Sequence, residues 1–360
     1  MKPKPNLVAL LLYLLLTPFL TWPLPLRLAN AVPGDIGDPL LNTWILAWDA
    51  HALLDGPRPL FQANIFFPLP NTLAFSEHLL STATLALPLQ PLTAEPLLAY
   101  NLSLLATFPL AAFGMYLLAR RQTGRRGAAF VAGLVFAFAP YRLAAISHLQ
   151  LLTLHWLPYS LLFLREILAA DAPSRRRWRH AAGLAITLTA QLLASWYLAV
   201  YTAMAIAVWL AFVLPLRRPP RQALLPAAAA LLATGLLVAP AARPYFALAG
   251  DLRQSRPLSW ALPLAAAPTD YVAAAPANRL FGPLTASFRA RPGFTEEHTL
   301  FVGLVAPLLA LVAAGSVLRR AAPRRRAEIL ALAALLLLAV ALTFPAPYAA
   351  LAALFPPSTL

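Results

Sequence analysis

The sequence predicts an all-α polytopic membrane protein with about nine transmembrane helices, and three observations lead to this prediction. Hydrophobic residues make up 60% of the 360 residues and charged residues only 11%, a composition that excludes a soluble enzyme. Charge-free runs such as 222–242 are long enough to cross about 30 Å of hydrocarbon at about 1.5 Å per helical residue. Basic residues gather in short segments between such runs, as in the cytoplasmic loops of membrane proteins.

The distribution of charge predicts the orientation of the chain. Of the 28 Lys and Arg residues, 18 fall in five clusters, namely Lys2 and Lys4; Arg120, Arg121, Arg125 and Arg126; Arg175, Arg176, Arg177 and Arg179; Arg217, Arg218 and Arg221; and Arg319, Arg320, Arg324, Arg325 and Arg326. Ten of the 13 acidic residues lie in segments expected on the opposite side. We therefore expect a cytoplasmic N-terminus. The net charge of +15 then reflects orientation and attraction to anionic lipid headgroups, not a nucleic-acid partner.

The expected spans follow from the positions of these runs. Pro18, Pro23 and Pro25 should kink the outer half of the first one. The charge-free run 181–216 would extend about 54 Å as a single helix, so it should form two spans with a break near Ser195–Trp196–Tyr197. The expected spans are 7–29, 96–119, 127–144, 147–169, 181–196, 197–216, 223–243, 299–318 and 328–344.

Two long segments are expected outside the membrane on the side opposite the basic clusters. The first extracytoplasmic loop, 31–95, should carry an amphipathic interfacial helix at 39–54 and a second interfacial stretch at 79–93. The second loop is expected at 244–298. Because 346–360 follows the last span without a polar tail, we expect this end to be truncated.

Asp35 and Asp38 lie directly after the first span, flanked by glycines. One interpretation makes Asp38 the N-cap of the helix that Pro39 begins. The other is catalytic: two carboxylates three residues apart at the boundary of water and lipid repel each other, and one of them could act as a general base.

Glu77 and His78 open the second interfacial stretch. They could form an ordinary first helical turn, or they could help to hold a phosphate or a metal ion together with Asp35 or Asp38. The sequence leaves both interpretations open.

Four further polar residues are expected at the same membrane face or, for His155, about two turns below it. His148 and His155 are seven residues apart and should face the same direction on one helix. Arg142 could snorkel to the interface or bind a lipid phosphate. Glu297 should lie in the first turn of a helix that Thr295 caps, at the mouth of a span.

Several short motifs occur in a fixed order along the chain. They are Gly37-Asp38-Pro39-Leu40-Leu41-Asn42 with Trp44 and Trp48, Asn64-Ile65-Phe66-Phe67-Pro68, Ser76-Glu77-His78, Phe138-Ala139-Pro140-Tyr141-Arg142 with Ser147-His148, and Glu297 before Leu300-Phe301-Val302-Gly303-Leu304. Together with the order of spans and loops, they resemble the GT-C superfamily of integral membrane glycosyltransferases and, more narrowly, the bacterial YfhO-like membrane proteins over roughly residues 1–345.

The resemblance implies transfer of a sugar from a polyprenyl-phosphate carrier to an acceptor at the outer face of the bacterial cytoplasmic membrane, within the cell envelope. Asp38 matches the acid that activates the acceptor in such enzymes, and Asp35 is the second choice. A divalent cation, Mg²⁺ or Mn²⁺, is possible in this superfamily. The residues expected to bind the donor phosphate or the substrate are Arg142, His148, His78, Glu77, Trp196, Tyr197 and Glu297.

Two other functions stay open: a transporter of a lipid-linked sugar or similar amphiphile, and a truncated membrane protein without catalytic activity. A transporter would need acids deep within spans, yet the two acids on expected spans, Glu166 and Glu328, both lie near basic inner ends. The sequence therefore favours the enzyme.

Overall fold

The computed structural model describes residues 5–55, 59–170, 172–217, 219–252, 259, 262–289, 297–320 and 323–354. Throughout these ranges the regular structure is helical, without strands, so the all-α prediction is confirmed. The chain forms two compact units. The first comprises Met1–Phe138, Ile146–Thr202 and Pro219–Leu248, and the second comprises Ala139–Ala145, Ala203–Arg218 and Ala249–Leu360.

The described residues include four helices that are long and apolar enough to cross a membrane: Pro96–Thr123, Arg126–Ala144, Trp196–Pro215 and Arg221–Leu248. Shorter apolar helices cover Asn6–Leu20, Val305–Gly315 and Glu328–Thr343. Large apolar side chains such as Leu231, Leu232 and Leu236 are more than half exposed, which suits a surface that faces lipid. These features support a membrane protein. The number of nine spans stays a prediction.

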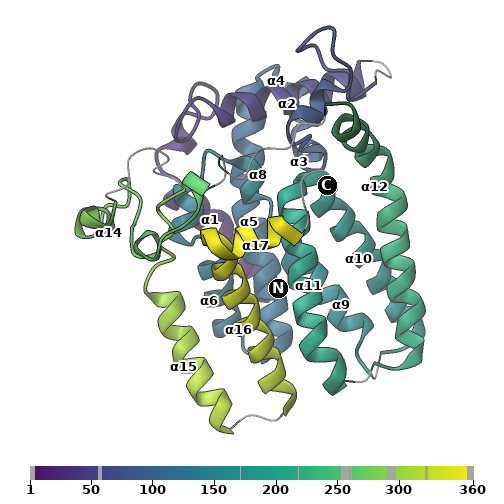
Figure 1. Ribbon diagram of the computed structural model, residues 1–360, viewed down its shortest axis with the longest axis vertical. Coiled ribbons are helices and arrows are strands. Elements are labelled where there is room, and N and C mark those ends of the chain that lie inside the picture. Colours follow the sequence, from purple (N-terminus) through teal and green to yellow (C-terminus); the bar gives the residue numbers. More distant parts are fainter. Residues whose placement is uncertain are drawn as a thin grey trace. The chain divides into compact units, whose positions relative to one another are not determined.

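The helices of the first unit are built around α5. They are α1 Pro5–Leu20, α2 Asp38–Leu54, α3 Leu80–Ala86, α4 Gln90–Thr93, α5 Pro96–Thr123, α6 Arg126–Ala137, α8 Leu149–Leu152, α9 Trp156–Ile167, α10 Ser174–Ala194, the start of α11 Trp196–Arg217, and α12 Leu224–Leu252, with short 3-10 turns at Leu24–Leu26, Thr72–Phe75 and Arg221–Ala223. α5 packs against α1, α2, α3, α6 and α9. Figure 1 shows it as a long upright helix with α2 and α4 near one end.

Small residues allow the helices around α5 to approach closely. A Cβ atom on Gly114 of α5 would lie 2.7 Å from the ring of Tyr159 on α9. A Cβ atom on Gly133 of α6 would overlap the hydroxyl of Tyr13 on α1, which donates a hydrogen bond to the Phe130 carbonyl at 2.8 Å. Glycines at these positions let helix backbones pack tightly, as is common in membrane bundles.

The predicted break between two helices near Ser195 is confirmed. α10 ends at Ala194, Ser195 is extended with φ −164° and ψ 125°, and α11 begins at Trp196. The expected helix at 39–54 is also present, as α2.

Four expected helices differ from the structure. The one expected over 127–144 is divided after Ala137, and a separate short helix begins at Pro140, which has no backbone N–H with which to continue the first. α1 ends at Leu20, since Pro23 and Pro25 have no backbone N–H with which to continue it. The helix expected over 147–169 is interrupted between α8 and α9, because Pro158 fits the first turn of a new helix but would break the interior of a continuous one. The sequence suggested that His148 and His155 share one helix. This prediction is wrong, because His148 precedes α8 and His155 precedes α9.

The fourth difference lies in the second unit, where the helix expected from 299 begins only at Val305. The preceding segment is held out of a helix by backbone bonds, because Leu300 N donates to Asp270 O at 2.9 Å and Phe301 N to Ala273 O at 3.3 Å. Gly303, with φ +86°, then turns the chain into α15.

The helices of the second unit are short except near its end. They are α7 Pro140–Ala144, the rest of α11, α14 Phe281–Leu284, α15 Val305–Arg320, α16 Pro323–Thr343 and α17 Pro345–Leu354, with 3-10 turns at Leu262–Leu264, Pro268–Tyr271 and Ala286–Phe288. α16 packs against α15 and α17. The hydroxyls of Tyr271 and Thr343 lie 2.7 Å apart and join the 3-10 turn to the end of α16.

Candidate functional site

Asp38 is bound by residues far away in the sequence. Its Oδ2 atom accepts a hydrogen bond from Gln150 Nε2 at 2.7 Å, and Gln150 Oε1 accepts one from Asn42 Nδ2 at 2.9 Å. The helix begins at Asp38 with Gly37 at the N-cap, and no side chain makes a capping bond there. The interpretation of Asp38 as an N-cap is therefore wrong, because its carboxylate is bound by Gln150.

His148 lies beside the same carboxylate. Its Nε2 atom is 3.7 Å from Asp38 Oδ2, and its Nδ1 atom is 3.0 Å from the hydroxyl of Ser147. The side chains are partly accessible, with 37% of Asp38 and 21% of His148 exposed. The structure thus brings together two residues that the sequence named separately, in an arrangement that a molecule from outside can reach.

The loop that carries Asp38 is fixed by its own backbone and by α5. Asp35 Oδ1 accepts a hydrogen bond from Gly37 N at 2.7 Å, which turns the chain just before Asp38. Asn101 Nδ2 donates to Leu28 O and Ala31 O, each at 2.7 Å. Asp35 therefore shapes the loop with its carboxylate, whereas Asp38 presents its carboxylate to other segments.

Close packing also holds the loop against the segment that carries His148. Gly34 has φ +72°, and a Cβ atom on it would lie 2.9 Å from Ser147 Cβ. Tyr100 of α5 is fully buried and interacts electrostatically with Asp35 and Asp38. Its hydroxyl has no hydrogen-bond partner among the described residues. We refer to Asp35, Asp38, Asn42, Tyr100, His148 and Gln150 as the Asp38 cluster.

Glu77 has a different role from the one that the sequence suggested. Its carboxylate accepts hydrogen bonds from Ser195 Oγ at 3.0 Å, Trp196 N at 2.9 Å and Tyr197 N at 3.3 Å. It therefore caps the N-terminus of α11, where backbone N–H groups lack partners within the helix. Burial raises the pKa of Glu77, and these three hydrogen bonds oppose that effect.

His78 is buried in a cluster of aromatic rings. Its ring centroid lies 5.9 Å from Phe61, 6.0 Å from Trp196 and 5.9 Å from Tyr245. Its Nδ1 atom accepts a hydrogen bond from Leu80 N at 3.1 Å, and burial lowers its pKa to about 4. A neutral imidazole does not offer the positive charge that binding of a donor phosphate would need.

Two further candidates, Trp196 and Tyr197, belong to the first unit and contact Glu77 through their backbone N–H groups. The Trp196 ring also packs against His78, whereas the side chain of Tyr197 is mostly exposed. Arg142 belongs to the second unit and is buried there. Glu297 is exposed in a turn of the second unit, while the suggested capping residue Thr295 lies outside the described residues.

The second unit contains a buried pair that the sequence did not single out. His298 Nδ1 lies 3.0 Å from Asp270 Oδ2, and Ala267 N also donates to that oxygen, at 2.8 Å. In this segment the sequence singled out Glu297, but the next residue, His298, is the one that forms the buried pair with Asp270. Their separation by 28 positions hid this pair from sequence reasoning.

Asp49 is a second residue that sequence reasoning missed. It lies on the buried face of α2 with Ile45 and Leu46, is fully buried, and neither carboxyl oxygen has a hydrogen-bond partner among the described residues. Burial raises its pKa well above the ordinary value, so the neutral acid is favoured. Its spacing on α2 indicates an inward-facing residue, but nothing in the sequence indicates an inward-facing carboxyl without partners.

The described residues do not fit a site for a divalent cation. Among them, no three His, Asp or Glu side chains gather as the ligands of a metal ion would. Glu77 and His78 contact α11 and aromatic rings, while Asp38 contacts Gln150 and His148.

No protein-family model, curated protein or solved structure matches the chain. The Asp38 cluster is the part of the described chain whose chemistry points to a function.

Proposed function

We propose that this protein is a GT-C-type glycosyltransferase of the bacterial cytoplasmic membrane, with its N-terminus in the cytoplasm. It transfers a sugar from a polyprenyl-phosphate carrier to an acceptor hydroxyl at the outer face. The observation that carries the proposal is the Asp38 cluster, in which a partly exposed carboxylate is fixed by Gln150 and faces His148. The apolar helices support a lipid environment, and hence a lipid-linked donor.

Asp38 has the geometry of a general base. Gln150 occupies Oδ2, whereas Oδ1 has no hydrogen bond to the described residues and is left for an acceptor hydroxyl. In the proposed step the acceptor O–H gives its proton to Asp38 as its oxygen bonds to the anomeric carbon of the donor. The bond between this carbon and the phosphate oxygen breaks, and its electron pair leaves with the polyprenyl phosphate. Asp38 then releases the proton to water. Catalysis of this type contributes about 10²–10⁴-fold in rate.

His148 and Asp35 serve this step differently. His148, 3.7 Å from Asp38 Oδ2, would in its protonated form place a positive charge beside the reacting groups, where negative charge develops on the departing phosphate. Asp35 is a positioning residue, because its carboxylate holds the turn that leads into Asp38. Asn42 positions Gln150.

Discharge of a loaded carrier tests the proposal. The purified full-length protein, in lipid vesicles, is supplied with a panel of polyprenyl phosphates that carry a hexose or a pentose and with a panel of acceptors that offer sugar hydroxyls, and release of free polyprenyl phosphate is measured. We expect Asp38→Asn to lower the rate about 100-fold or more. Asp55→Asn is the matched control, because it removes the same charge at the other end of α2, where the Asp55 side chain is 64% exposed.

Two results would contradict the proposal. If the wild type discharges no loaded carrier in the panel, a carrier protein or a protein without catalytic activity becomes the better account. If Asp38→Asn and Asp55→Asn discharge the carrier as fast as the wild type, Asp38 is not the base.

A further inference from the structure

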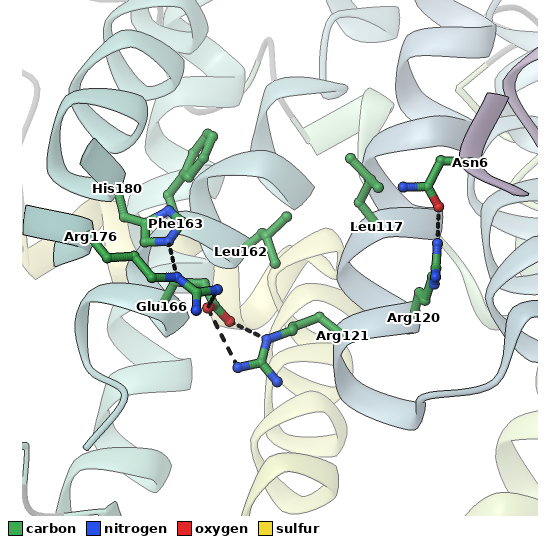
Figure 2. Close-up of a pocket in the computed structure, with 9 residues that line it drawn as sticks. All are labelled: Asn6, Leu117, Arg120, Arg121, Leu162, Phe163, Glu166, Arg176 and His180. Atoms are coloured by element: carbon green, nitrogen blue, oxygen red, sulfur yellow. Dashed lines mark hydrogen bonds and ion pairs between the residues drawn. The ribbon is translucent and has the colours of Figure 1, made fainter. Parts of the chain in front are cut away.

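A pocket lies where the ends of four helices of the first unit meet. Its volume is about 380 Å³, within the size range of ligand sites. Asn6 comes from α1, Arg120 and Arg121 from the C-terminal end of α5, Glu166 from α9, and Arg176 and His180 from α10. Figure 2 shows these polar side chains gathered around the cavity with three apolar residues on its wall.

Glu166 organises the arginines of this pocket. Its side chain is 6% exposed, and it forms ion pairs with Arg121 Nε and, at 3.1 Å, with Arg176 Nη2. Arg176 Nε also lies 3.3 Å from His180 Nε2. The two arginine side chains stay 48% and 55% exposed, and the Nη1 atom of each makes no hydrogen bond to the described residues. A buried carboxylate thus fixes two guanidinium groups while they still have donors to offer.

The pocket carries an excess of positive charge. Three arginines, Arg120, Arg121 and Arg176, line the pocket together with one carboxylate, Glu166, which leaves a net charge of +2 (3 − 1). A second hollow of about 370 Å³ shares Arg176 and His180 and adds Arg175 and Arg179. Like charges held this close favour binding of an anion, and guanidinium groups match the oxygens of a phosphate better than those of a halide.

We infer that this pocket binds a phosphate group. Its position favours an anionic lipid headgroup as the source, because the basic clusters predict that this end of the helices faces the cytoplasm, where anionic lipids attract arginines. The apolar wall residues Leu162 and Phe163 suit the glycerol and acyl portion of such a lipid. Free phosphate offers the same oxygens to the arginines, and the experiment below distinguishes it from a lipid headgroup.

This site is distinct from the Asp38 cluster. Tyr100, which belongs to that cluster, and Arg120 lie 20 residues apart on α5, a distance of about 30 Å along the helix. That is the thickness of the hydrocarbon core of a bilayer, so a phosphate bound here is not the leaving group of the proposed transfer. The inference does not depend on the proposed function.

Lipid retention tests the inference. The full chain is purified, placed in vesicles of phosphatidylcholine with or without phosphatidylglycerol, extracted, and examined by native mass spectrometry for bound lipid. We expect the wild type to retain phosphatidylglycerol, and Arg176→Gln and Arg120→Gln each to bind it about fivefold more weakly. Arg120→Gln is included because Arg120 does not contact Glu166 and its loss leaves that carboxylate paired. Arg125→Gln is the matched control, since Arg125 follows in the same basic segment but does not line the pocket.

A second arm measures the melting temperature of the lipid-free protein in detergent with inorganic phosphate, against the same concentration of chloride. If phosphate raises the melting temperature of the wild type and of Arg125→Gln but not of Arg120→Gln, the pocket recognises phosphate from a soluble source as well. Retention of phosphatidylglycerol without any effect of phosphate identifies the lipid as the source. The inference is overturned if neither ligand binds, or if Arg125→Gln weakens binding as much as the pocket variants do.

Discussion

Replacing Glu77 with alanine should weaken the start of α11. The carboxylate accepts hydrogen bonds from Ser195 Oγ, Trp196 N and Tyr197 N at 3.0, 2.9 and 3.3 Å. A hydrogen bond to a charged group contributes about 1.5–3 kcal/mol, and the cost of burying the carboxylate offsets part of this sum. We therefore expect Glu77→Ala to lower the free energy of unfolding by about 2–4 kcal/mol.

Glu77→Gln is the informative comparison. An amide of the same shape keeps one oxygen that can accept from α11, but its NH₂ group replaces the other acceptor, so one donor loses its partner at a cost of about 1–2 kcal/mol. Unfolding in mixed micelles, followed by tryptophan fluorescence, measures both variants against the wild type. Equal losses for the two variants, or a loss below about 0.5 kcal/mol for Glu77→Ala, would refute the capping role.

The remaining predictions concern His78, Gly34 and Arg177. Burial lowers the pKa of His78 from 6.5 to about 4, so the unfolded chain binds a proton at this residue at a higher pH than the folded chain does. The neutral His78 therefore contributes about 3 kcal/mol to the free energy of unfolding above pH 6.5, and this contribution is lost as the pH falls towards 4. In unfolding measured across pH, His78→Gln should show a weaker loss of stability over this range. Gly34→Ala should cost more than Gly124→Ala in unfolding free energy: both have φ near +70°, with a strain of about 1–2 kcal/mol, but only at Gly34 does the added Cβ meet Ser147. Arg177 is buried and donates hydrogen bonds to the carbonyls of Ile167, the last residue of α9, and of Ala170 just beyond it. Arg177→Gln should therefore lower the free energy of unfolding by about 2–4 kcal/mol and lower the melting temperature, whereas Arg175→Gln, at an exposed position, should change neither. Equal effects within either pair of variants, or an unchanged pH slope in His78→Gln, would contradict the corresponding argument.

Two buried acids, Asp49 and Glu77, also make the free energy of unfolding depend on pH, but they do not affect the comparison of wild type with His78→Gln. Burial raises the pKa values of Asp49 and Glu77, so their protonated forms favour the folded state, and their contribution is full at low pH and lost as the pH rises. This trend has the opposite sign to that of His78 and is present in both proteins. The difference between wild type and His78→Gln therefore reports on His78.

Local patterns in the sequence predicted part of the fold. The break at Ser195 follows from the length of a charge-free run, and α2 follows from Asp38-Pro39 before a run with helical spacing. The interruption before α9 could have been predicted from Pro158, whose position suits a helix start. These features depend on residues close together in the chain, where propensity and length decide the outcome.

Long-range contacts limited the prediction of the site. Asp38 and His148 were named from the sequence, but Gln150, which joins Asp38 to Asn42, was not, because a glutamine 112 positions from its partner leaves no local pattern. For the same reason Glu77 could not be identified as a cap for a helix that begins 119 positions later. Such roles depend on which helix ends the packing brings together.

Native mass spectrometry of the detergent-purified protein tests the central claim most directly, with wild type, Asp38→Asn and Asp55→Asn measured in parallel for bound polyprenyl phosphate and its glycosylated form. If Asp38 activates the acceptor of a bound donor, the wild type and Asp55→Asn should carry the bare carrier lipid, whereas Asp38→Asn should accumulate the sugar-loaded form. The claim is contradicted if none of the three proteins holds a polyprenyl lipid, or if all three hold the loaded and bare forms in the same ratio.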